Sequence, residues 1–244
     1  MTLSKLFFRC VNRSYIHTPP SADYAFDRVN NNLTLYFQDS DGIVDWLHNL
    51  NFPANAYLRE GETVWYAHRG FLTVWESLVP RIYPLVADPH IQRITVAGYS
   101  HGAALAIFCH EYVWFHRPDL RDRLDGYGFG CPRVLWGRPG SDLRARWETF
   151  TVVRNLDDLV THLPPRILGY HHVGRMLEIG EAGKYSAVDA HRPENIRREL
   201  RAYEARKHND EKNTGLHKEK KQKALDKREV LCYNTSIKTE DEEE

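Results

Sequence analysis

The sequence Ile94-Thr-Val-Ala-Gly-Tyr-Ser-His-Gly-Ala-Ala-Leu-Ala-Ile-Phe108 decides the fold that we expect for this chain. Residues 94–97 favour a strand, Gly98-Tyr-Ser-His-Gly102 follows, and a run rich in Ala and Leu then favours a helix. The pattern G-x-S-x-G in this setting is typical of a sharp strand-to-helix turn that exposes the serine hydroxyl at the sheet edge. The N-terminus of the following helix would stabilise negative charge beside Ser100. The stretch therefore indicates a serine nucleophile; a purely structural turn is the alternative, because the bare motif also arises by chance.

Length and composition favour one globular domain. The chain has 244 residues, of which 42% are hydrophobic and 12% aromatic, and its formal net charge is zero. A net charge of zero does not indicate a nucleic-acid-binding protein, and no apolar stretch is long enough for a transmembrane helix. The apolar core Leu6-Phe7-Phe8 is too short for a secretory signal. Four scattered cysteines show no metal-ligand spacing, so we expect Cys109 and Cys131 in the core, no metal or organic cofactor, and a cytoplasmic location.

Strand and helix patterns alternate along most of the chain. The strand-like segments are Leu33–Phe37, Val64–Ala67, Thr149–Arg154 and Arg175–Ile179. Phe71–Val86 has the apolar spacing of a core-facing helix with a kink at Pro80. This alternation predicts an α/β fold with a mainly parallel central sheet flanked by helices. Residues 1–32 are mixed, break at Pro19-Pro20, and suggest a peripheral approach to the domain.

The composition changes near Ala190, after which charged residues dominate and few apolar positions remain. We therefore predict that residues 1–190 form one α/β domain that contains the candidate serine. Residues 191–244 would form a charged helical C-terminal extension that ends in a disordered acidic tail.

A serine hydroxyl needs a neighbouring base to remove its proton, and that base needs an acid to orient it. In α/β chains these groups follow the serine in the order acid, then histidine, on loops at the carboxyl ends of strands. The available acids are Asp157 and Asp158, directly after a predicted strand. The available histidines are His162, His171 and His172. The residues alone leave the choice among them open.

Six segments together resemble the class 3 lipases, the fungal triacylglycerol lipases and their relatives within the α/β-hydrolase fold. The segments, in the order and spacing of that family, are Phe37-Gln-Asp-Ser-Asp-Gly-Ile-Val-Asp-Trp46 for F-R-G-T-x-S-x-x-D-W, His68-Arg-Gly-Phe71 for H-x-G-F, Gly98–Ala104 for G-H-S-L-G-G-A, Phe129-Gly-Cys-Pro-Arg-Val134 for F-G-S-P-R-V, Asp158-Leu-Val-Thr-His-Leu-Pro-Pro165 for D-x-V-P-R-L-P-P, and Gly169-Tyr-His-His172 for G-F/Y-x-H.

The resemblance implies a role for each matching residue. Ser100 would be the nucleophile, Asp158 the orienting acid and His172 the base. The backbone amides of Ser40 and His101 would form the oxyanion hole. The segment from Gly42 to Leu50 falls where the fungal enzymes carry their lid, so its apolar residues would cover the substrate. Those lid and substrate-binding residues are Ile43, Trp46 and Leu47.

Three substitutions depart from the family pattern. Gln38-Asp39 stands in place of Arg-Gly, so a carboxylate enters the oxyanion segment. His101 stands in place of Leu and is expected to face solvent, and Ala103 stands in place of the last glycine of the turn. None of these departures replaces Ser100, Asp158 or His172. An Asp39 carboxylate that points into the site would disfavour the oxyanion, whereas one that points outward would not.

The resemblance implies a serine carboxylic-ester hydrolase, a lipase or esterase, that acts on a small acyl ester or a lipid through an acyl-enzyme. The polar composition and short lid favour an intracellular enzyme for partly soluble esters over one for bulk fat droplets, with transient contact at a lipid interface left open. One alternative is a phospholipase or acyl-carbohydrate esterase of the same fold. The other is a non-catalytic scaffold whose charged C-terminal helices bind a partner.

Overall fold

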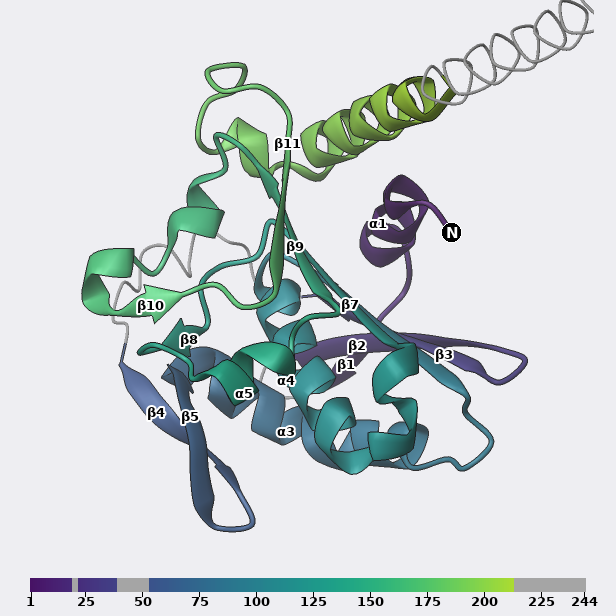
Figure 1. The fold of residues 1–244 in the computed structure, drawn as a ribbon, viewed down its shortest axis with the longest axis vertical. Coiled ribbons are helices and arrows are strands. Elements are labelled where there is room, and N and C mark those ends of the chain that lie inside the picture. Colours follow the sequence, from purple (N-terminus) through teal and green to yellow (C-terminus); the bar gives the residue numbers. More distant parts are fainter. Residues whose placement is uncertain (19–21, 39–52, 213–244) are drawn as a thin grey trace, which may run out of the picture. The chain divides into compact units, whose positions relative to one another are not determined.

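The computed structural model describes residues 1–18, 22–38 and 53–212 (Figure 1). Two compact units divide the chain, Met1–Leu200 and Arg201–Glu244. The first unit extends beyond the predicted boundary at residue 190 because Ile196 and Leu200 are completely buried. Residues 193–200 are helical, and so are residues 201–212 of the second unit. The predicted acidic tail lies outside the described residues.

A seven-stranded sheet forms the centre of the first unit. Its strands, in spatial order, are β1 (Ile16–Thr18), β2 (Ala22–Val29), β3 (Asn32–Gln38), β6 (Arg93–Tyr99), β7 (Leu124–Phe129), β9 (Phe150–Asn155) and β11 (Arg175–Ile179). The pairings from β3 to β11 are all parallel, whereas β1, β2 and β3 are antiparallel to one another. The prediction of a mainly parallel central sheet is confirmed.

A second, antiparallel sheet lies beside the first. It consists of β10 (Tyr170–His171), β8 (Leu135–Trp136), β5 (Glu62–His68) and β4 (Ala54–Arg59), in that order. These strands are at the lower left of Figure 1, away from the parallel strands β7, β9 and β11. The strand predicted at Val64–Ala67 therefore exists, but it belongs to this second sheet.

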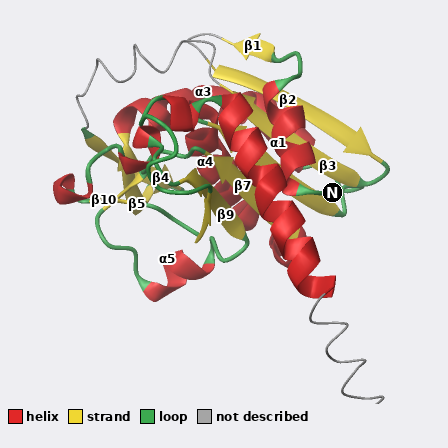
Figure 2. Ribbon diagram, turned by 90° about the horizontal axis from the view of Figure 1, so that it is seen from above, coloured by secondary structure: helices red, strands yellow, loops and turns green. Residues whose placement is uncertain are grey.

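Helices cover both faces of the central sheet (Figure 2). In the described part of the chain these include α1 (Leu3–Val11), α3 (Arg69–Val86), α4 (His101–His116) and the short α5 (Ser141–Ala145). Short 3-10 turns connect other elements of that part: η1 (Pro118–Arg123), η2 (Leu159–His162), η3 (Arg166–Leu168) and η4 (Asp189–His191). Neighbouring side chains of a strand point to opposite faces. Ile94 and Val96 of β6 accordingly join the cluster that contains α3 and α4, whereas Tyr99 meets Phe7 of α1 with 5.6 Å between ring centroids.

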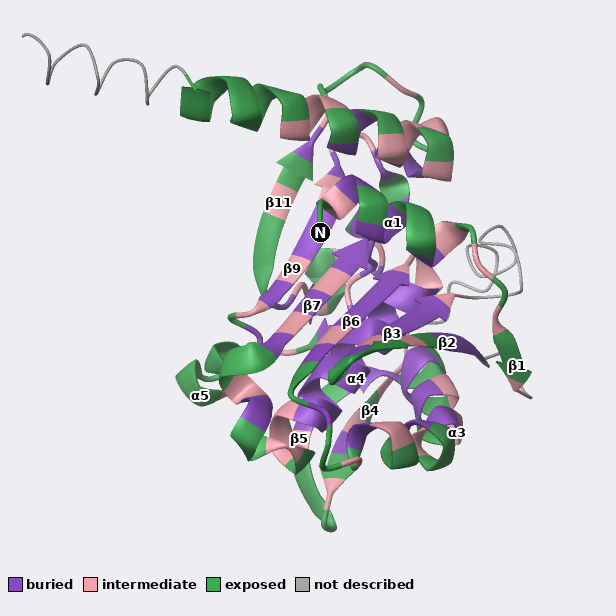
Figure 3. Cartoon of the chain, turned by 90° about the vertical axis from the view of Figure 1, so that its right-hand side faces the viewer, coloured by how far each residue is buried: buried purple, intermediate pink, exposed green. Residues whose placement is uncertain are grey.

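Burial shows how tightly α4 is enclosed. Every residue from Gly102 to Val113 is buried, and Figure 3 shows the same helix in the interior, behind the sheet. Because α4 is buried on all sides and mostly apolar, it lies inside the core and supports the serine turn at its start. The N-terminal segment is not peripheral as predicted, because Phe7 is completely buried and β2 is a full member of the sheet. Cys109 and Cys131 are buried, as expected.

Candidate active site

Ser100 lies in a strained turn between β6 and α4. Its backbone has φ 57° and ψ −123°, a conformation that costs a non-glycine residue about 1–3 kcal/mol and is concentrated at functional sites. The flanking glycines are required by close packing. A Cβ atom at Gly98 would lie 2.0 Å from the carbonyl oxygen of Gly102, and one at Gly102 would lie 2.1 Å from that of Phe37. The turn therefore holds α4 directly against β3.

The carboxyl ends of the parallel strands bring distant residues to one edge of the sheet. Ser100 follows β6, Gly130 follows β7, Asp158 follows β9, and His191 follows β11. Because these strands are parallel neighbours, the loops that leave them gather at the same edge, where α/β proteins place their sites. His191 was not among the residues predicted for the site.

Asp158 and His191 form a buried pair at this edge. The His191 Nδ1 atom lies 2.8 Å from Asp158 Oδ2 and 2.9 Å from Oδ1. The Asp158 carboxylate also accepts a 2.9 Å hydrogen bond from the backbone amide of Val160. Asp158 is completely buried and His191 is 5% exposed. Gly130 packs so closely on the pair that a Cβ atom there would lie 2.7 Å from His191 Cε1.

The contact with Asp158 fixes the tautomer of His191. A carboxylate only accepts hydrogen bonds, so the neutral ring carries its proton on Nδ1 and presents a lone pair at Nε2. His191 Nε2 is buried and has no hydrogen-bond partner among the described residues. An imidazole that is oriented by a buried carboxylate and has a free Nε2 is the arrangement required of a general base.

Tyr99, which precedes Ser100, holds His191 from two sides. The two rings stack with centroids 5.0 Å apart and an interplanar angle of 20°. The Tyr99 hydroxyl also donates a 2.7 Å hydrogen bond to the backbone carbonyl of His191. The serine turn and the histidine loop are thereby joined through one side chain.

His172, the predicted base, occupies a different environment. Its Nε2 atom donates a 2.7 Å hydrogen bond to the carbonyl oxygen of Thr161, not to a carboxylate. Burial lowers its pKa to about 4. His172 precedes β11, whose first residue, Arg175, pairs with Thr151 near the start of β9, so it approaches the sheet from the edge opposite Ser100. The structure therefore does not bring His172 together with Asp158.

The other predicted residues differ in how far the structure describes them. Asp157 is bonded to the backbone amides of Gly183 and Tyr185, which lower its pKa and give it a structural role in that loop. The His101 ring is half-buried and edge-on to Phe71, with centroids 5.1 Å apart, and does not face solvent as expected. Asp39 and four predicted site residues lie outside the described residues; the four are Ser40, Ile43, Trp46 and Leu47.

An apolar pocket opens beside His191. Its volume is about 280 Å³. Its lining consists mostly of apolar side chains, including Tyr99, Leu159, Val160 and Val188. The part of the chain that the structure describes contains no group of three or more His, Cys, Asp or Glu residues arranged to hold a metal ion. Within the same part, no helix is both long and apolar enough to cross a bilayer.

Solved structures with the same fold include fungal lipases. A lipase from Rhizopus microsporus var. chinensis superposes with a TM-score of 0.58 and 23% identity, covering 68% of this chain and 60% of its own. A mono- and diacylglycerol lipase from Aspergillus oryzae gives a TM-score of 0.56 and 23% identity, covering 72% of this chain and 66% of its own. These likenesses confirm the α/β-hydrolase fold.

Two curated relatives are named as secreted mono- and diacylglycerol lipases. The protein from Fusarium solani is 30% identical over 61% of this chain and 44% of its own length. The protein from Malassezia globosa is 28% identical over 66% of this chain and 53% of its own length. The prediction of a cytoplasmic location is therefore wrong, since these relatives point to the outside of the cell. This chain spans about half the length of the relatives it matches.

The family model of the class 3 lipases matches residues 34–168. This segment is more than half of the chain and includes Ser100 and Asp158 but ends before both His172 and His191. The match, the fold and the relatives agree with the resemblance found in the sequence motifs. The chain belongs to the class 3 lipase family.

Proposed function

We propose that this chain is a serine carboxylic-ester hydrolase in which Ser100 is the nucleophile, His191 the base and Asp158 the orienting acid. The observation that carries the proposal is the buried Asp158–His191 pair, with 2.8 Å between Nδ1 and Oδ2, at the sheet edge that holds the strained Ser100. The residues occur in the chain order serine, aspartate, histidine, which is the order of α/β-hydrolases. His191 takes the role that the sequence motifs assigned to His172.

The mechanism follows from the roles of these atoms. The Ser100 hydroxyl attacks the ester carbonyl while His191 Nε2 accepts its proton, and the buried Asp158 carboxylate stabilises the imidazolium that forms. The amide of His101, at the N-terminus of α4, donates to the developing oxyanion. His191 then protonates the departing alcohol, which leaves an acyl group on Ser100. Water activated by His191 releases the acid and restores the serine.

The proposed substrates are acyl esters of glycerol, including monoacyl- and diacylglycerols. Two relatives are named for that activity. The apolar pocket beside His191 supports the same choice, because aliphatic chains gain free energy when they leave water for such a lining. The proposal concerns the 244 residues of this chain, since the match covers only 44% of the Fusarium solani relative.

Ester hydrolysis by Ser100→Ala tests the proposal, with Ser141→Ala as the matched control. Ser141 is exposed, at the start of α5, and is not part of the candidate site. With p-nitrophenyl butyrate and a monoacylglycerol as substrates, we expect Ser100→Ala to lose on the order of 10⁴-fold or more in turnover. The control should keep full activity. Equal activity in both variants would refute the serine mechanism, and no activity in the unmodified chain would favour a non-catalytic scaffold.

A further inference from the structure

The η3 turn presents an apolar surface that the fold itself does not use. Ile167 is 93% exposed and Leu168 is 51% exposed. The neighbouring side chain of Trp136 on β8 is 43% exposed and that of Tyr66 on β5 is 45% exposed. Single exposed apolar residues are common on soluble proteins, but a connected group of them marks a surface for a partner or a lipid.

Hydrogen bonds hold this surface in a fixed shape. The Trp136 indole donates a 3.0 Å hydrogen bond to the carbonyl oxygen of Leu168, and the Gly137 amide donates a 2.9 Å bond to that of Gly169. Gly169 ends η3 in the left-handed conformation, with φ 87°, where a side chain would be strained. Tyr66 meets Trp136 edge-on, with ring centroids 5.8 Å apart. The tip is therefore a rigid protrusion backed by two aromatic rings.

Two exposed arginines, Arg138 and Arg166, lie close in sequence to the residues of this apolar tip. Arg166 adjoins Ile167, and Arg138 follows Trp136 by two residues; both are exposed. Arg133 lies inward, where its guanidinium donates a 2.9 Å hydrogen bond to the carbonyl of Pro164. Burial lowers the pKa of His171, next to the turn, and all three arginines lower it further. Three positive charges therefore lie close enough to His171 to act on it, and two of them, Arg138 and Arg166, are exposed.

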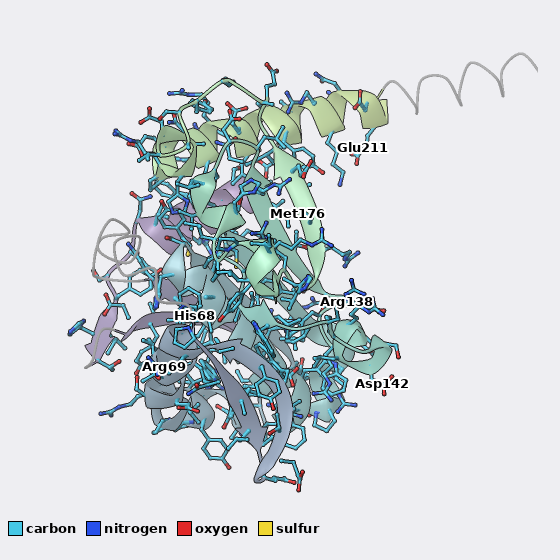
Figure 4. The ribbon with its side chains drawn as sticks, turned by 90° about the vertical axis from the view of Figure 1, so that its left-hand side faces the viewer. His68, Arg69, Arg138, Asp142, Met176 and Glu211 are labelled. Carbon is cyan, nitrogen blue, oxygen red and sulfur yellow. The ribbon has the colours of Figure 1, made fainter. Side chains whose placement is uncertain are left out.

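Figure 4 faces this side of the molecule and labels Arg138 on its exposed surface. Asp142 is the acidic side chain labelled near it, and its carboxylate interacts with the hydroxyl of Ser141, 3.2 Å away. Exposed aliphatic residues, aromatic rings with polar atoms, and arginines together match the layers of a lipid surface: acyl chains, interface and anionic headgroups.

We propose that the η3 surface, defined as Tyr66, Trp136, Arg138, Arg166, Ile167 and Leu168, docks the protein on an anionic lipid surface. Ile167 and Leu168 enter the boundary between headgroups and acyl chains. Trp136 and Tyr66 lie at headgroup level, where their amphipathic rings are stable. Arg138 and Arg166 bind the anionic headgroups. This role does not depend on hydrolysis, so it can be tested even if the proposed ester chemistry fails.

Vesicle flotation of the full chain tests this proposal. The probes are vesicles of ether-linked phosphatidylcholine, with or without an equal part of ether-linked phosphatidylglycerol, because these lipids carry no carboxylic ester to cleave. We expect stronger binding to the anionic vesicles. The double variant Ile167→Ser/Leu168→Ser should bind both kinds on the order of tenfold more weakly. The double variant Arg138→Gln/Arg166→Gln should lose about fivefold for each arginine on anionic vesicles only.

Matched controls distinguish binding through the η3 surface from non-specific adsorption of the protein to vesicles. Val29→Ser removes another exposed aliphatic side chain, 62% exposed at the end of β2, and Arg81→Gln removes an exposed arginine of α3. Both should bind like the unmodified chain, and all variants should hydrolyse a soluble short-chain ester at the same rate. Equal binding to neutral and anionic vesicles, equal losses in the controls, or no vesicle binding at all would overturn the proposal.

Discussion

Replacing either of two histidines by glutamine distinguishes the base proposed from the structure from the one predicted from the sequence. Gln is similar in size to His but cannot accept a proton from Ser100. In His191→Gln, the Asp158 carboxylate keeps a hydrogen-bond donor nearby, but the basic Nε2 atom is lost. Loss of a triad histidine leaves only the oxyanion hole and substrate binding, so we expect kcat to fall on the order of 10⁴-fold or more.

His172→Gln should have a different effect. Its Nε2 proton already bonds the Thr161 carbonyl, and its pKa of about 4 shows a ring that burial keeps neutral. The Gln amide can still donate but not from the position of the ring nitrogen, so the weakened hydrogen bond should cost up to about 1.5 kcal/mol of folding free energy. The expected change in kcat is less than about tenfold, since no reacting atom is touched.

The assay is the steady-state hydrolysis of p-nitrophenyl butyrate by both variants, with circular dichroism and denaturant unfolding to confirm that each is folded. We expect His191→Gln to be folded and inactive, and His172→Gln to be active and slightly less stable. A folded, inactive His172→Gln together with an active His191→Gln would refute the assignment of His191 as the base.

The packing around the site leads to three further predictions. Gly98→Ala should cost more than about 3 kcal/mol in denaturant unfolding, because its Cβ atom would lie 2.0 Å from a backbone oxygen, whereas Gly140→Ala, with open space, should be nearly neutral. Tyr99→Phe keeps the stacking on His191 but loses the 2.7 Å hydrogen bond, so kcat should fall up to about tenfold with KM unchanged; an unchanged kcat would contradict a positioning role. Burial lowers the pKa of His110 from 6.5 to about 3, so between these pH values the unfolded chain binds more protons than the folded chain. The melting temperature should therefore decrease as the pH is lowered from 6.5 to about 3, and it should decrease less steeply in His110→Gln.

Local sequence was enough to predict the serine turn. Gly98, Ser100 and Gly102 are close in sequence, and the strand and helix on either side are recognisable from short runs. Local sequence placed an acid directly after the strand 149–154 but left Asp157 and Asp158 as alternatives, and only the resemblance to the family motif selected Asp158. Family motifs added the expectation of a class 3 lipase, and the family match confirmed it.

The histidine could not be chosen by motif alone. The match to G-F/Y-x-H selected His172, but that residue precedes β11, whereas the edge that holds Ser100 collects loops that follow the parallel strands. His191 lies beyond β11, at the end of the short 3-10 turn η4 and past the end of the family match. The strand order favours His191 over His172, but this order depends on pairings between distant segments that periodicity does not reveal.

The N-terminal helix illustrates a signal that was present in the sequence. Leu3, Leu6, Phe7 and Cys10 have the spacing i, i+3, i+4, i+7 of one helical face, and all but Leu3 are completely or almost completely buried. The second sheet was predicted only in part: β5 contains the strand expected at residues 64–67, whereas β8 and β10 are two-residue strands that exist only through their partners.

The most direct test of the central claim is to find where an active-site-directed fluorophosphonate attaches. This probe reacts with a serine only when a base activates it. Peptide mapping by mass spectrometry should locate one adduct on Ser100 in the unmodified chain and in His172→Gln, and none in His191→Gln. Absence of labelling in the unmodified chain, labelling at another residue, or undiminished labelling of Ser100 in His191→Gln would contradict the Ser100–His191–Asp158 site.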